Sequence, residues 1–180
     1  DPRLATLAQI FGSQKILPAT VSFVDIAGIV RGASQGEGLG NKFLTHIREV
    51  DAIVQVVRCF EDEDVHHVSG AVDPVRDIEV INTELMLADL ESVTKKRERV
   101  HKDAKRGDKG AAAEDAVLAR LIEALEAGRP ALTVPLSADE RAVSRQFFLL
   151  SDKPTIFACN VKDTDLAAAA SNPHVMKVRD

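Results

Sequence analysis

Three short apolar runs constrain the fold of this chain more than any other feature. They cover residues 20–24, 52–60 and 154–160, and each is nearly continuous in apolar or β-branched residues. Strands that lack an alternating pattern are typical of a sheet covered on both faces, as in a parallel sheet flanked by helices. Residues 41–50 have helical spacing and predict a crossover helix, and residues 3–11 predict a short amphipathic helix before a glycine. The pattern therefore predicts an α/β fold with a parallel sheet.

A different pattern occupies residues 73–146. Asp73 followed by proline is a helix start, and two apolar stripes separated by Gly107 predict an antiparallel helical hairpin close to a short coiled coil. A capping box then predicts one more helix before the chain re-enters the sheet. We expect a first part of the α/β domain at 1–72, an inserted helical arm at 73–146, and a return to the domain at 147–180.

Composition excludes several classes of function. The net charge of −5 gives no overall preference for polyanions, and seven Phe with no Trp or Tyr disfavour a protein that stacks single-stranded bases on aromatic rings. No apolar run approaches the ~20 residues that span a bilayer, so no membrane partner is expected. The two cysteines are expected to be free thiols in the reducing cytoplasm. No zinc-type spacing or hydrolase triad is present, and nothing predicts reading of DNA sequence.

The first apolar run leads into Asp25 and Gly28, an Asp-x-x-Gly pattern followed by a glycine-rich stretch. A carboxylate at the carboxyl end of a parallel strand can hold Mg²⁺, usually through water, because this ion prefers oxygen ligands. Gly28 lets its backbone N–H approach a terminal phosphate with no Cβ in the way. The alternative is an ordinary strand that leads into a tight turn. The length of the glycine-rich stretch favours a nucleotide site that responds to hydrolysis.

The blocks "FVDIAGIVRGASQGEGLGNKFL", "VVRCFEDEDVHHVSG" and "DPVRDIEVINTELMLADLE" resemble the Obg-related YchF subfamily, the Obg-like ATPases. The resemblance covers essentially the whole chain. It implies a P-loop nucleotide triphosphatase domain of the TRAFAC/Obg type, interrupted by a helical arm and followed by a TGS domain. It also implies hydrolysis of ATP, often in preference to GTP, and association with the ribosome, either the large subunit or the 70S particle.

One motif of that family has no counterpart in these residues. No Gly-x-x-x-x-Gly-Lys-Ser/Thr loop occurs, so we expect the loop and its strand upstream of Asp1 and the TGS domain downstream of Asp180. In P-loop folds that strand lies between the strands that correspond to residues 20–24 and 52–60. We therefore expect a gap in the sheet of this segment. We also expect that the segment by itself does not hydrolyse nucleotide.

The group that positions the attacking water is a separate question. Ile29 stands where Ras-like enzymes place a glutamine, and it cannot hydrogen-bond to water. The resemblance points to His67, because a histidine can orient water or relay a proton. The other candidates are backbone groups of the glycine-rich stretch, including Gly28. The alternative is that His67 belongs to a surface loop with no catalytic part.

Residues Asn160, Val161 and Asp163 close the third apolar run, where base-reading residues are expected. A guanine reader usually has Asn-Lys-x-Asp, whereas here valine takes the second position. The subfamily typically has Asn-x-x-Glu, which is associated with ATP, and Asp163 is shorter than that glutamate. Asn160 can still bond the N6/N7 edge of adenine. We expect ATP rather than GTP, and the alternative is an ordinary exit from a strand.

The tip of the predicted hairpin is basic. Residues 95–109 hold eight Lys or Arg and three acids, for a net charge of +5. Such clusters attract phosphate, so contact with rRNA is the functional interpretation, and a solvated coiled-coil surface is the alternative. The candidate RNA-binding residues are Lys95, Lys96, Arg97, Arg99, Lys102, Lys105 and Arg106.

Two functions of different classes follow. The first is a nucleotide-dependent switch ATPase in which residues 33–40 report hydrolysis to the arm. The second is a helical-arm module that binds the ribosome or RNA on an α/β scaffold that does not hydrolyse nucleotide. The glycines at 32, 36, 38 and 40 favour the switch, because each costs ~0.5–1 kcal/mol relative to alanine in ordered structure.

Overall fold

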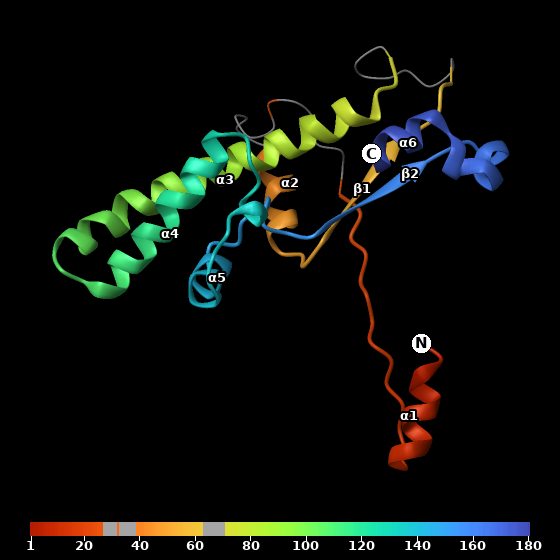
Figure 1. Ribbon diagram of the computed structural model, residues 1–180, viewed down its shortest axis with the longest axis horizontal. Helices are drawn as coiled ribbons and strands as arrows, with labels where there is room; N and C mark the ends of the chain where they lie inside the picture. Colours follow the sequence, from red (N-terminus) through yellow and green to blue (C-terminus); the bar gives the residue numbers. More distant parts are fainter. Residues whose placement is uncertain (27–31, 33–38, 63–70) are drawn as a thin grey trace.

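The computed structural model describes residues 1–26, 32, 39–62 and 71–180. Figure 1 shows a long helical hairpin on one side and a small parallel sheet on the other. The elements in chain order are α1 (Arg3–Phe11), α2 (Leu39–Arg48), β1 (Ile53–Arg58), α3 (Pro74–Lys105), α4 (Lys109–Glu126), η1 (Ala131–Thr133), α5 (Ala138–Arg145), β2 (Thr155–Asn160), η2 (Asp163–Ser171) and α6 (Pro173–Arg179).

The sheet joins two strands that are far apart in the chain. β1 and β2 pair in parallel, with a register that runs from Ile53 opposite Thr155 to Arg58 opposite Asn160. α3 packs against β1, and the Gln55 side chain donates to the Asn82 side chain of α3 at 2.9 Å. The predicted parallel pairing, with helices inserted between its strands, is therefore confirmed.

Two expectations about the strands are wrong for the described residues. Residues 20–24 are not in a strand, and Val21, Phe23 and Val24 are largely exposed. An extended run becomes a strand only by pairing with a neighbour, and this run has none in the described part of the chain. The sheet is also not covered on both faces: β1 alternates between buried and exposed residues, and Val56 and Ile156 are open to solvent. α3 covers only one of the two faces.

The arm forms as its sequence predicts. The Asp73 side chain accepts a hydrogen bond from the backbone N–H of Arg76 and starts α3. Gly107 turns the chain with a φ of +94°, which favours glycine, and the Asp108 side chain then caps α4. The capping box at Ser137 is present at the start of α5. The buried core of the hairpin consists of Val93, Val117, Leu118, Leu121, Ala124, Leu125, Ala131, Val134, Phe147 and Leu149.

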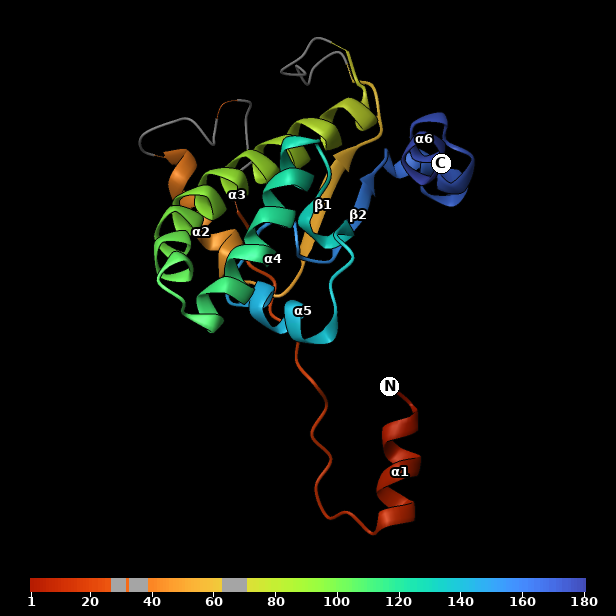
Figure 2. The same cartoon turned by 60° about the vertical axis from the view of Figure 1, so that its left-hand side comes forward.

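A second apolar cluster joins the arm to the rest of the molecule. Leu44 and Ile47 of α2 pack there with Leu85 and Ala88 of α3 and with Leu150. Figure 2 shows α2 beside α3 near the sheet. This cluster, called the junction below, lies where the helical arm meets the segment that follows the glycine-rich stretch.

The amino-terminal helix stands apart from this body. Both views show α1 at the end of an extended segment, and Ile10 and Phe11 are exposed. Its predicted end is confirmed, because Gly12 takes a left-handed conformation and closes the helix. Among the described residues, no helix is both long and apolar enough to cross a membrane.

Candidate functional site

The carboxyl ends of β1 and β2 meet at one edge of the sheet, where ligands bind in open α/β folds. Asn160, the last residue of β2, is exposed there and lies opposite Arg58. Val161 is half-buried, and Asp163 is exposed at the start of η2. These three predicted base-reading residues thus lie together after β2, with two of them open to solvent.

Two side chains hold the backbone that directly follows β1. The Arg58 guanidinium donates to the carbonyl of Phe60 at 3.0 Å and lies 4.7 Å from the centre of the Phe60 ring. The Asn172 side chain donates to the carbonyl of Cys59 at 3.3 Å and also caps α6. The side chains of Arg58 in β1 and of Asn172 at the start of α6 therefore hold the chain at the edge of the sheet that carries Asn160.

The candidate magnesium ligand lies close to the junction. Asp25 is exposed, and its neighbour Ile26 is half-buried against the junction residues. Ile26 thus anchors the chain while the carboxylate of Asp25 faces solvent. One carboxylate fits Mg²⁺ in a nucleotide site, because the ion keeps several waters and takes its other ligands from phosphate. The candidate residues Gly28 and His67 lie outside the described residues.

The part of the chain that the structure describes contains no cluster of metal-binding side chains. Among the described residues, no group of three or more His, Cys, Asp or Glu side chains could hold one. The two cysteines are free thiols, as expected, and burial raises the pKa of Cys59 to about 12, with Cys159 next to it adding to the shift. A thiol with such a pKa is a packing group rather than a nucleophile.

Asp89 is the most buried acid at the junction. Its carboxylate accepts hydrogen bonds from the backbone N–H of Leu150 at 2.9 Å and from the N–H and hydroxyl of Ser151, both at 2.7 Å. The Arg48 guanidinium of α2 lies 3.8 Å away and donates to the carbonyl of Phe148. Burial raises the pKa of Asp89, and the hydrogen bonds and Arg48 oppose that rise. One carboxylate therefore joins α3, the chain before β2, and α2.

A second acid of α3 contacts the glycine-rich stretch directly. Glu84 is 4% exposed, and its Oε1 accepts a hydrogen bond from the backbone N–H of Gly32 at 2.6 Å. Sequence analysis missed both Glu84 and Asp89. A signal was available, since each is an acid within the apolar stripe of α3, and an acid is almost never fully buried unless it has partners.

The basic residues of the hairpin divide into two groups, and the first group faces α4. Lys96 pairs with Glu114 at 2.9 Å, and Arg97 pairs with Asp115 at 3.0 Å. His101 Nδ1 lies 3.1 Å from the second oxygen of Asp115. Partial burial works to raise the pKa of Asp115, but hydrogen bonds from His101 and Arg97 outweigh it and hold the pKa below its usual value. These pairs hold the two helices together.

The second group points to solvent. Lys95, Arg99 and Lys102 repeat at helical spacing along one side of α3, and these three residues are exposed, as are Lys105 and the C-cap residue Arg106. Lys95 pairs with Glu91 and Arg106 with Asp103 on the same helix. Within the described chain, Arg99, Lys102 and Lys105 form no ion pair. We call these three residues the free basic patch, since their charge is the part available to a partner.

Known proteins resemble this chain in both sequence and fold. A model of the 50S ribosome-binding GTPase family matches residues 3–87. The chain is 48% identical to the ribosome-binding ATPase YchF of Bacillus subtilis and 51% identical to that of Escherichia coli O157:H7, over all 180 residues and 49% of each relative. The structure of the Schizosaccharomyces pombe YchF GTPase matches 99% of this chain and 49% of its own, with a TM-score of 0.78 and 36% identity.

These matches define the class: the chain has the fold of a P-loop nucleotide triphosphatase, with a helical hairpin inserted before the last strand described above. It is homologous to the YchF proteins along its whole length, which confirms the resemblance inferred from its sequence blocks. The chain spans about half the length of the curated relatives that it matches.

Proposed function

We propose that this chain is part of a ribosome-associated P-loop nucleotide triphosphatase that hydrolyses ATP, and GTP to a smaller extent, as a nucleotide-dependent switch. The observation that carries the proposal is homology along all 180 residues to proteins named ribosome-binding ATPases. A cytoplasmic location follows from work at the ribosome. The division into a domain at 1–72 and 147–180 and an arm at 73–146 is part of the proposal.

In this proposal the chain supplies the Mg²⁺ and base-reading parts of the nucleotide site. Asp25 would orient the Mg²⁺ that bridges the phosphates, and Gly28 would approach the γ-phosphate through its backbone N–H. Asn160, Val161 and Asp163 would receive the base at the edge of the sheet. When bound, Mg²⁺ neutralises charge that develops on the phosphates. His67 is the candidate for holding the attacking water.

The ribosome-facing part of the proposal is contact with rRNA through the free basic patch of α3. Its three exposed bases carry no partner in the described structure, whereas Lys96 and Arg97 are occupied by acids of α4. Contacts to phosphate release counterions and weaken with salt. The competing function, a ribosome-binding module that does not hydrolyse nucleotide, draws on the same surface but needs no Asp25.

Replacement of Asp25 by alanine in the full-length protein separates the two functions. We expect turnover of ATP to fall by a factor of about 100 or more, because the ligand that places Mg²⁺ on the phosphates is lost. Phosphate release is measured with ATP and GTP in competition, and ribosome binding by cosedimentation. Asp165→Ala, which changes a half-buried acid of η2 outside the proposed nucleotide site, is the control. Wild-type turnover by Asp25→Ala would contradict the role assigned to Asp25, whereas a full-length protein that binds ribosomes without any turnover would favour the module.

A further inference from the structure

Glu84 is a buried charged group that the proposed nucleotide site does not use. It lies in the first half of α3, yet its side chain accepts a hydrogen bond from the backbone of Gly32, 52 residues earlier in the chain. A hydrogen bond to an ionised acceptor is stronger than one between neutral groups, and a buried carboxylate is costly without such partners. The N–H of Gly32 is thus one of the partners that make the burial of Glu84 possible.

Gly32 has a conformation that suits the contact. Its φ is +87°, a region that residues with a Cβ rarely adopt, while a Cβ at this position would meet nothing within 4 Å. Glycine is thus required here for its backbone geometry and not for lack of space. The turn directs the N–H of Gly32 at Glu84.

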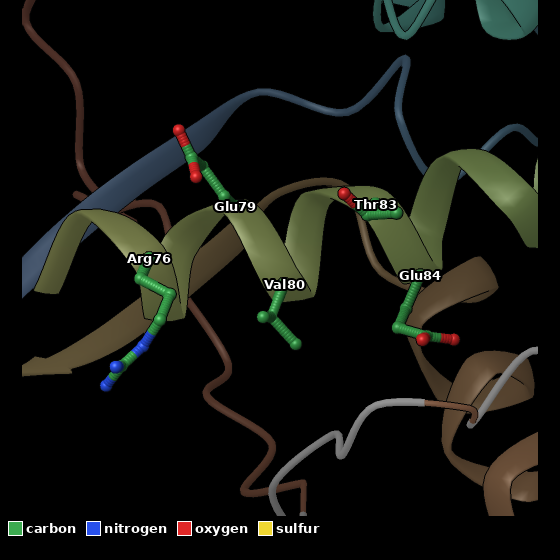
Figure 3. Close-up of a pocket in the computed structure, with 5 residues that line it drawn as sticks. All are labelled: Arg76, Glu79, Val80, Thr83 and Glu84. Carbon is green, nitrogen blue, oxygen red and sulfur yellow. The ribbon is translucent and has the colours of Figure 1, made fainter. Parts of the chain in front are cut away.

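Gly32 and the described segments on both sides of the glycine-rich stretch contact α3 or the junction. Figure 3 shows Arg76, Val80 and Glu84 on the same side of the helix, around a shallow hollow of about 180 Å³. Leu85, the next residue, packs against α2 in the junction, where Ile26 also lies. The chain is thus attached to α3 before the glycine-rich stretch, within it at Gly32, and after it at α2.

We propose that Glu84 is a positioning residue for nucleotide hydrolysis, which acts by fixing the backbone of the glycine-rich stretch through Gly32. This inference rests on the proposed function. Gly28 comes four positions before Gly32 in the sequence, so chain length alone limits its Cα to a range of about 14 Å around this anchor. Glu84 limits the positions that the N–H of Gly28 can take relative to the γ-phosphate, and it does so from the arm. It is not a catalytic residue, since it need not touch the nucleotide.

The test compares two substitutions in the full-length protein. Glu84→Met keeps the size of the side chain and removes the acceptor, whereas Glu84→Gln keeps an acceptor oxygen for the N–H of Gly32. For Glu84→Met we expect kcat for ATP to fall about tenfold and KM to change less than about twofold, as when a bond that orders the reactive state is lost. Hydrogen exchange at the amide of Gly32 should become faster. Glu84→Gln should lose clearly less than Glu84→Met in each quantity, because it keeps a neutral acceptor in place of the ionised one.

Glu79→Met is the matched control, because Glu79 is an exposed acid of the same hollow that points to the other side of α3 (Figure 3). It should behave as the wild type. The inference is overturned if Glu84→Met keeps wild-type kcat, if Glu84→Gln loses as much as Glu84→Met, or if the amide of Gly32 exchanges in the wild type like an unprotected amide. A wild type without turnover would overturn the proposed function itself and the role of Glu84 with it. Turnover that is indifferent to Glu84 overturns only the inference.

Discussion

Single acids of α3 determine how the arm is attached to the molecule. Asp89 is fully buried and gives both of its oxygens to the backbone and hydroxyl of the chain before β2. The guanidinium of Arg48 balances its charge. Burial without these partners would be prohibitive for a carboxylate, so Asp89 and the residues that it bonds form one unit.

We predict that Asp89→Asn destabilises the full-length protein by about 1–3 kcal/mol, because an amide nitrogen then faces a backbone N–H that has lost its acceptor. The free energy of unfolding in urea measures the effect. Glu91→Gln, which changes an exposed acid of the same helix, should cost no more than ~0.5 kcal/mol. Equal losses in the two variants would show that the hydrogen bonds of Asp89 contribute little.

Residue patterns predicted the features that depend on neighbours in the sequence and missed the contacts between residues far apart in the chain. The caps at Asp73 and Ser137 and the turn at Gly107 depend on neighbours within a few residues, and all three are confirmed. Asp89 finds its partners 61 and 62 residues away, and Glu84 finds Gly32 52 residues away. No periodicity within α3 carries information about those distant segments.

At the scale of the element, α3 has two sides with different tasks. One side bonds the acids Glu114 and Asp115 of α4, and the other exposes the free basic patch. The sequence predicted the positive charge of the tip. It could not show which of the bases are paired, because the acids that neutralise Lys96 and Arg97 belong to another helix. A functional test must therefore avoid the residues that hold the hairpin together.

We predict that charge reversal of the free basic patch, Arg99→Glu with Lys102→Glu and Lys105→Glu, weakens ribosome binding and leaves stability nearly unchanged. If three phosphate contacts are lost, the dependence of log affinity on log salt should fall by about two units. Cosedimentation with ribosomes at several salt concentrations gives the slope. Lys96→Glu with Arg97→Glu should instead lower the unfolding free energy, since both ion pairs to α4 become repulsive.

A second variant controls for net charge. Lys15→Glu, Arg129→Glu and Lys177→Glu change the charge by the same amount at exposed positions outside the tip of the hairpin. If this variant binds ribosomes as weakly as the first, overall charge and not the free basic patch determines binding. Unchanged affinity in the patch variant would remove the proposed rRNA contact.

At the scale of the molecule, the described sheet has fewer strands and less cover than the sequence predicts. The residues at 20–24 are extended but unpaired, and the face with Val56 and Ile156 is open. Apolar composition correctly indicated strands at β1 and β2, but composition cannot say whether a pairing strand or a covering helix is present. That is why the expected strand at 20–24 is absent from the described structure, while the expected gap beside it stays a prediction.

We predict that the 180-residue chain does not hydrolyse ATP or GTP by itself, because it contains no phosphate-cradling loop with its lysine. Release of phosphate is measured with Mg²⁺ and either nucleotide, and the full-length protein serves as the positive control. Turnover by the chain within about tenfold of the full-length rate would show that its own residues suffice for the chemistry.

Because α3 is long, a small tilt where it is attached would produce a large displacement at its tip. The helix is 32 residues long, and both Glu84 and Asp89 lie in its first half. The helix continues for 21 residues beyond Glu84 and 16 beyond Asp89, a span of about 24–32 Å at 1.5 Å per residue. A tilt of α3 by about 10° at the junction would carry the tip through about 5 Å. A displacement too small to break the packing around Leu85 would still move the basic tip by about the length of one helical turn.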